Sequence, residues 1–139
     1  MKYIKYFESE EYRTSCYDYG RNLKESDVLD IQEMFRDIAD DYNLEKVDNI
    51  NDSENGTYKI HTECMFSGFS PTTLDTMIHI ESIELTLRSN NIKLFNVMES
   101  FKKRLEGIGY KARFSIFNLP KTTPFQIFKE NNVLKLIIE

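Results

Sequence analysis

The chain has 139 residues, a formal net charge of −5 and a sequence pI near 5.2, with 40% hydrophobic and 29% charged residues. These values fit one soluble domain with a core large enough to fold without disulfides or metal. The negative charge opposes binding to nucleic acid and to anionic membranes, and no apolar run approaches the roughly 18 residues that span a bilayer. We therefore expect a soluble protein in a reducing compartment, with Cys16 and Cys64 as free thiols.

Residues 1–25 have the least regular pattern in the sequence. The spacing of Ile4 and Phe7 fits one face of a short helix, and an extended arm is the alternative. Residues 9–25 are polar and carry Tyr12, Tyr17 and Tyr19, which predicts an irregular segment. We therefore expect a single domain over residues 1–139, with residues 1–25 as an N-terminal arm.

A helix is predicted from about Asp27 to Asn43, with Ser26 as its N-cap. Apolar side chains recur at helical spacing along one face: Val28, Ile31, Phe35, Ile38 and Tyr42. The opposite face is acidic: Asp30, Glu33, Asp37, Asp40 and Asp41. This amphipathic pattern is typical of a helix that packs on a core and exposes its charged side. The polar stretch DNINDSENG then turns the chain.

Two strands are predicted next, over residues 57–66 and 76–88. In the first, Tyr58, Ile60, Thr62, Cys64 and Phe66 alternate with Lys59, His61 and Glu63, so we place Cys64 on the apolar, core-facing side. The second starts with Ile78 and Ile80 in phase and then shifts by one residue to Ile83, Leu85 and Leu87. Such a shift predicts either a bulge near Ser82 or burial of both faces.

The second half of the chain contains one further helix and three strands. The helix runs from about Ile92 to Glu106, with Gly107 as its C-terminal cap, and a strand follows over residues 109–117. The stretch FQIFKENNVLKLIIE is predicted to form a closing hairpin around Asn131 and Asn132. We expect VLKLIIE to be an interior strand; at a sheet edge it would instead pair with another chain, which would allow a homodimer.

These elements predict an α+β domain in which two amphipathic helices pack on one side of a mostly antiparallel sheet. The expected architecture is a two-layer sandwich, and a ferredoxin-like variant is the leading topology. The reason is the helix–glycine–strand order of residues 92–117, which is common in the crossovers of that fold. The analogy concerns the fold alone and carries no function.

The two histidines of the chain both stand in His-x-Glu pairs, His61 with Glu63 and His79 with Glu81. A hairpin register that pairs His61 with Glu81 would also pair Glu63 with His79, so all four side chains would share one face. Two imidazoles and two carboxylates can bind zinc or iron, which makes this set a candidate metal site. The simpler interpretation is a solvated sheet face, and we favour it because these residues lie opposite the predicted core.

The other catalytic motifs are absent from the sequence. The chain has no P-loop, Gly-x-Gly-x-x-Gly or Gly-x-Ser-x-Gly motif, and no Pro-Cys-x-x-Cys follows either His-x-Glu pair. We therefore expect no cofactor and no enzymatic activity. The stretch YKARFSIF places Lys111 and Arg113 near Phe117, similar to the aromatic strand of RNA-recognition domains. The glycines of that pattern are missing, so an RNA-binding sheet is the weaker alternative.

The opening MKYIKYFES, followed by DIQEMFRDIADDYNLEKV, resembles small uncharacterised proteins encoded by tailed bacteriophages. Met1, Lys2, Phe7 and Glu8 also resemble the capsid-targeting leader of internal head proteins. The resemblance implies a phage-encoded protein in the host cytoplasm or the virion, and it implies no catalytic residues.

We therefore predict a non-enzymatic protein-interaction module, either virion-associated or directed at a host protein. The expected contact residues are in the tyrosine-rich N-terminal segment and on the acidic helix: Tyr12, Tyr17, Tyr19, Asp30, Glu33 and Asp37. The alternative is a small metal- or ligand-binding domain that uses His61, Glu63, His79 and Glu81.

Overall fold

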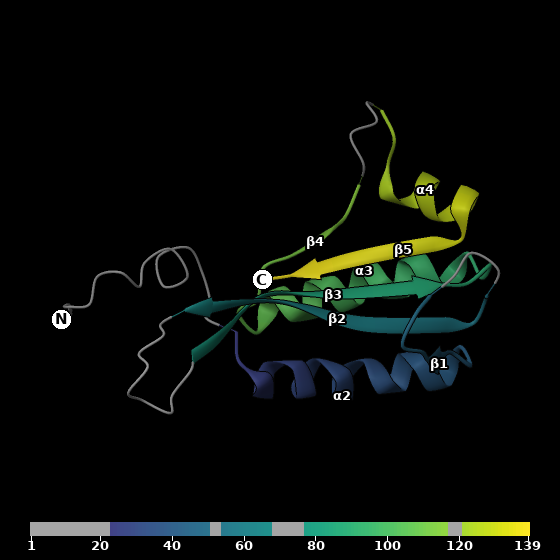
Figure 1. The fold of residues 1–139 in the computed structure, drawn as a ribbon. Coiled ribbons are helices and arrows are strands. Elements are labelled where there is room, and N and C mark those ends of the chain that lie inside the picture. The colour runs from purple at the N-terminus through teal and green to yellow at the C-terminus, as the bar shows by residue number, and fades with distance from the viewer. Residues whose placement is uncertain (1–22, 51–53, 68–76, 117–120) are drawn as a thin grey trace.

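A computed structural model of the chain describes residues 23–50, 54–67, 77–116 and 121–139 (Figure 1). The predicted contacts at Tyr12, Tyr17 and Tyr19 and the expectation for Cys16 lie outside the described residues. The helices are α2 (Glu25–Asp41), α3 (Lys93–Gly107) and α4 (Pro124–Asn131). The strands are β1 (Glu45–Lys46), β2 (Thr57–Ser67), β3 (Met77–Arg88), β4 (Ala112–Phe114) and β5 (Val133–Ile138).

The strands form one five-stranded sheet in the order β1-β2-β3-β5-β4. The β1–β2 pair is parallel and the other pairs are antiparallel, so the predicted α+β class with a mostly antiparallel sheet is confirmed. The ferredoxin-like topology is not confirmed, because β1, β2 and β3 follow one another before the next helix begins. β5 lies between β3 and β4, which confirms that VLKLIIE is an interior strand.

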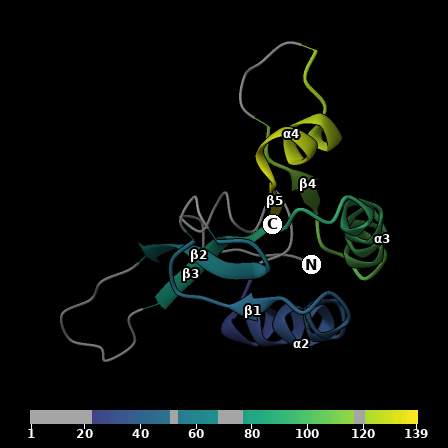
Figure 2. The same ribbon diagram turned by 90° about the vertical axis from the view of Figure 1, so that its right-hand side faces the viewer.

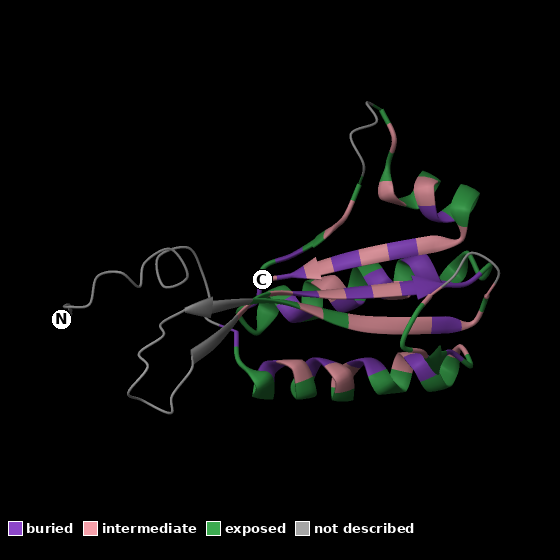
Figure 3. Cartoon of the chain, in the orientation of Figure 1, coloured by how far each residue is buried: buried purple, intermediate pink, exposed green. Residues whose placement is uncertain are grey.

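Helices α2 and α3 lie on the same side of the sheet (Figure 2). The centre of β3 supplies the floor of the core, where Ile83, Leu85 and Leu87 are fully buried and alternate with half-buried polar residues (Figure 3). The ring of Phe35 in α2 contacts Tyr58 of β2 and Phe101 of α3, with centroid distances of 4.8 and 5.7 Å. The core therefore joins both helices to one face of the sheet.

Helix α2 begins two residues earlier than predicted, and its N-cap is Lys24 instead of Ser26. The carboxylate of Asp27 explains the shift, since its Oδ2 accepts a hydrogen bond from the backbone N–H of Lys24 at 2.7 Å. The other oxygen, Oδ1, accepts the hydroxyl proton of Tyr110 at 2.7 Å. Asp27 is buried, so this contact ties the start of α2 to the chain entering β4.

The end of α3 also differs from the prediction. Gly107 is the last helical residue, and the positive φ of 106° belongs to Gly109. The N–H of Tyr110 donates to the carbonyl of Leu105 at 3.1 Å, which satisfies one of the free carbonyls of the last turn. The turn therefore lies at Gly109, two residues after the predicted cap at Gly107, and this position brings Tyr110 within hydrogen-bonding distance of Asp27.

The predicted closing hairpin is wrong in its first half, because residues 124–131 form helix α4. Thr123 caps this helix by accepting the N–H of Gln126 at 3.1 Å, and Pro124 occupies the first turn, where a proline is well tolerated. Asn132 has a φ of 59° and ends the helix. Its tolerance of this left-handed conformation had suggested a hairpin turn, but the same conformation serves as a helix C-cap.

Aromatic packing holds α4 in place. Phe128 is fully buried, and the ring of Phe95 in α3 lies 6.3 Å from it, 5.3 Å from Phe125 and 5.5 Å from Phe114 of β4. The tertiary contacts of Phe128 therefore decide in favour of the helix.

The predicted bulge near Ser82 is confirmed. Glu63 pairs with Ser82 and Cys64 pairs with Ile80, so Glu81 is the extra residue on β3. Cys64, however, is exposed, and its predicted place in the core is wrong. The pairing of β3 with β5 ends at Ile83, so Cys64 lies beyond the part of the sheet that carries the buried core.

Replacing Tyr110 with Phe should lower the free energy of unfolding by about 1–3 kcal/mol, because a buried carboxylate would lose a donor. Urea unfolding measures this loss of stability, provided that the dependence of the free energy of unfolding on urea concentration is the same in the variant and the wild type. Tyr42→Phe is the matched control, since Tyr42 is half-exposed and water can replace any partner of its hydroxyl. Equal stabilities of the two variants would contradict the structural role of the Tyr110–Asp27 contact.

Candidate functional site

The predicted hairpin register of the two His-x-Glu pairs is wrong. His61 pairs with Glu84 and His79 pairs with Met65, so His61 does not face Glu81. In the predicted register Phe66 would pair with Thr76, but it pairs with Ile78, which displaces the register by two residues, and the bulge at Glu81 displaces it by one more. Among the side chains that the structure describes, which do not include that of His79, no group of three or more His, Cys, Asp and Glu residues could hold a metal ion.

The remaining predicted contact residues are on the surface. Asp30, Glu33 and Asp37 are exposed on α2, and Glu33 forms an ion pair with Arg36 at 3.1 Å. Their role in partner binding stays a prediction. Of the residues proposed for RNA, Lys111 and Arg113 are exposed, and Phe117 lies outside the described residues.

The sheet face opposite α2 and α3 carries the polar members of each strand. Because side chains alternate along a strand, the residues between the buried positions all project to this second face. The pairing register brings the following residues together there: Lys59, His61 and Glu63 of β2, Glu84, Thr86 and Arg88 of β3, and Val133, Lys135 and Ile137 of β5. We call this surface the open face, since among the described residues no helix covers it (Figure 1).

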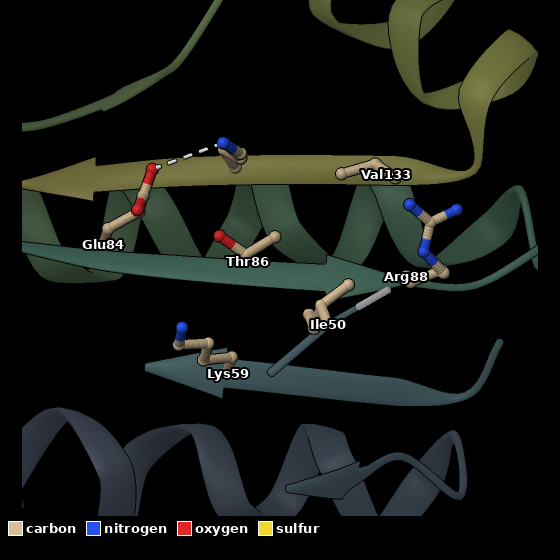
Figure 4. A pocket seen from close by; sticks show the side chains of 7 residues that line it. Ile50, Lys59, Glu84, Thr86, Arg88 and Val133 are labelled. Carbon is tan, nitrogen blue, oxygen red and sulfur yellow. Dashed lines mark ion pairs between the residues drawn. The ribbon is translucent and has the colours of Figure 1, made fainter. Parts of the chain in front are cut away.

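The open face is hollowed by a depression of about 310 Å³ over β2, β3 and β5 (Figure 4). Its lining residues are Ile50, Lys59, Glu84, Thr86, Arg88, Val133 and Lys135. Figure 4 shows Thr86 in the middle of this surface, Lys59 and Glu84 toward one end, and Arg88 and Val133 toward the other. The depression therefore extends along β3 from Glu84 to Arg88 and across the sheet to β2 and β5.

The charged groups of the depression form an ion pair and a hydrogen bond with neighbouring residues. The Lys135 ammonium lies 3.8 Å from a carboxylate oxygen of Glu84, and the pair is only partly exposed. Arg88 is buried, and its Nη1 donates to the carbonyl of Asn131 at 3.4 Å. Three cations and one carboxylate thus give the depression a positive charge on a chain whose net charge is −5. Such a surface attracts an anionic group locally.

The sequence pattern placed Lys59 on the outward face of its strand but did not single out Arg88 or Lys135. The alternation of apolar and polar residues did indicate that both face outward, since Arg88 follows Leu87 and Lys135 lies between Leu134 and Leu136. What the pattern lacked was the strand order. The depression exists because β5 returns to pair with β3, which brings Lys135 next to Glu84.

The outer edge of β2 is the second notable surface. The N–H groups of Glu45 and Val47 donate to the carbonyls of Gly56 and Tyr58, at 2.8 and 2.9 Å. The parallel pairing of β1 reaches only Thr57 and Tyr58. Within residues 23–50, 54–67, 77–116 and 121–139, no strand pairs with the rest of this edge of β2.

Tyr58 lies where β1 ends and packs against Phe35. Burial raises the pKa of its phenol above 10.0, while Arg36 opposes the shift and Asp40 adds to it. Folding therefore favours the neutral phenol, and this contribution to stability is lost only as the pH rises through the raised pKa.

No protein-family model matches the chain, and neither a curated protein nor a solved structure matches it. The resemblance to tailed-phage proteins therefore stays a prediction. No helix in the described parts of the chain has the length and hydrophobicity that crossing a membrane requires.

Replacing His61 with Ala should change the free energy of unfolding by no more than about 0.5 kcal/mol, because the side chain is exposed. Native mass spectrometry of the parent chain should give the same mass before and after treatment with a chelator. Ile83→Val is the reference for a change in the core, and it should lower the free energy of unfolding by about 0.5–1.5 kcal/mol. A transition metal that is removed by the chelator and is missing from His61→Ala would restore the metal-site hypothesis.

Proposed function

We propose that the protein is a non-enzymatic interaction module that binds an acidic segment of a partner protein on the open face of its sheet. The observation that carries the proposal is the positively charged depression, in which Lys59, Arg88 and Lys135 come from three adjacent strands. Its setting as a phage virion-associated or host-directed accessory protein rests on the resemblance of the N-terminal sequence.

The lining of the depression favours binding over catalysis. It offers two amines, one guanidinium, one carboxylate and one hydroxyl, and its lining residues include no histidine or cysteine. A general base or a nucleophile at neutral pH is most often one of these two residue types. The hydroxyl of Thr86 and the cations can instead bond to carboxylates, and Ile50 and Val133 can contact an apolar side chain.

A protein partner fits the open face better than RNA does. Proteins that bind single-stranded RNA on a sheet stack its bases on aromatic side chains. The described residues of the open face include no aromatic side chain, since Tyr58 and Phe114 belong to the face that carries the core. The mixture of Lys59 and Lys135 with Glu63 and Glu84 also suits a partner with patterned charges more than a uniform polyanion.

An acidic peptide should bind the wild-type chain with an affinity that falls as salt is added, because Lys59 and Lys135 are half-exposed and salt screens their charges. A fluorescent peptide in which glutamate alternates with serine is a suitable probe. Replacing both Lys59 and Lys135 with Gln should weaken its binding by about tenfold, which corresponds to about 1.4 kcal/mol.

The matched control is Lys102→Gln with Lys103→Gln, which removes the same charge from α3 on the opposite side of the sheet. This variant should bind the probe as the wild type does. Equal losses in the two double variants would mean that only net charge matters, and the proposed site would then be wrong.

A further inference from the structure

We infer that the outer edge of β2 takes up the partner segment as an added strand, with residues 59–63 of β2 as the template. This inference rests on the proposed function and deepens it, because it specifies the conformation of the partner. Strand addition is a common way in which a sheet binds an extended peptide, with backbone hydrogen bonds for affinity and alternate side chains for specificity.

The hydrogen-bonding pattern of the edge is the first part of the argument. The carbonyls of Gly56 and Tyr58 point toward β1, because they accept the N–H groups of Glu45 and Val47. N–H and C=O groups alternate in direction along a strand, so those of Ile60 and Thr62 point to the same side. β1 ends before it reaches them. No strand among the described residues pairs with Ile60 or Thr62 on this side, so each presents an N–H and a C=O in the geometry that a new strand requires.

The opposite edge of β2 is already paired, which makes the template rigid. Lys59, His61 and Glu63 pair with Thr86, Glu84 and Ser82 of β3. β3 is in turn paired with β5 over Ile83–Arg88. A strand added to β2 would therefore extend a sheet whose register is set, and the partner alone would lose conformational entropy.

The side chains of the template indicate which partner fits. Lys59 and His61 project onto the open face, and Lys59 also lines the depression. Ile60 and Thr62 project to the other face, where Ile60 packs against the core. Residues opposite each other on paired strands are in contact, so an added strand should place acidic side chains beside Lys59 and apolar ones beside Ile60. The inferred ligand is an extended segment with alternating acidic and apolar residues.

The peptide acetyl-Val-Glu-Val-Glu-Val-amide is the probe for this mode of binding, and amide hydrogen exchange of the full chain is the readout. At a peptide concentration ten times its Kd, exchange at Ile60 and Thr62 should slow by about tenfold. The amides of Lys59 and His61, which belong to the ladder with β3, should not change.

Two variants test the backbone contact. Thr62→Pro removes the outward N–H from a position where an edge strand tolerates proline, and it should abolish binding. Thr62→Val keeps the N–H and should bind as the wild type does. If Thr62→Pro does not fold, a peptide with N-methylated valines makes the same test on the wild-type chain, and it should not bind.

The outcomes separate this inference from the proposed function. One outcome is that the double change Lys59→Gln with Lys135→Gln weakens binding of the peptide, while the peptide leaves amide exchange at Ile60 and Thr62 of the wild-type chain unchanged. The open face then binds acidic segments, and strand addition is wrong. If these two amides are already protected in the free monomer, another part of the chain occupies the edge, and the inference fails. Protection that appears only with self-association would assign the edge to a second copy and would also overturn it.

Discussion

The burial of one face of β3 is the constraint on which the rest of the molecule depends. Ile83, Leu85 and Leu87 are fully buried under the helices, and the strand is paired on both sides. At about 1.5–3 kcal/mol for each large apolar side chain, such burial determines the register of both neighbouring strands. Because the side chains alternate, it also determines that Glu84, Thr86 and Arg88 face the other way. The polar open face is thus the direct counterpart of the core.

The chain between β3 and β5 completes this arrangement. It passes through α3, β4 and α4 before it returns, and β5 then enters the sheet between β3 and β4. Two local features direct the return. Phe128 anchors α4 against Phe95, and Asn132 reverses the chain with a positive φ. The N–H of Ser89 then donates to the carbonyl of Asn132 at 3.0 Å, which joins the end of β3 to the start of β5.

The two candidate surfaces meet at Lys59. This residue lines the depression on the open face and also begins the stretch of β2 whose outer edge pairs with no strand among the described residues. A segment bound along the edge can therefore direct an acidic side chain toward the depression while its backbone pairs with β2. The exposed acidic residues Asp30, Glu33 and Asp37 lie on α2, on the other side of the sheet. A positive depression and an acidic helix on opposite sides affect the orientation of an approaching partner more than its final affinity.

The sequence by itself determined the elements that have a strong internal period. The apolar stripes predicted α2 and α3 to within two residues, and the alternation in residues 57–66 and 76–88 predicted β2, β3 and a bulge near Ser82, which the structure has at Glu81. These patterns are local, since each follows from the geometry of a single helix or strand. The polar residues of the open face were visible in the same way, as the polar half of each alternation.

Only the tertiary structure decided which of these residues meet. The pairing of His61 with Glu84 instead of Glu81 follows from the pairing of Phe66 with Ile78 together with the bulge at Glu81, and the alternation around His61 does not encode which residues of the two strands meet. Helix α4 replaced a predicted strand because Phe128 finds a buried site against α3, a contact with a residue more than 30 positions away in the chain. Likewise, Lys135 approaches Glu84 through the order of the strands. The local spacing of apolar and polar residues therefore specified which face of each helix or strand is buried. Long-range pairing of the strands specified which polar residues come together in the depression.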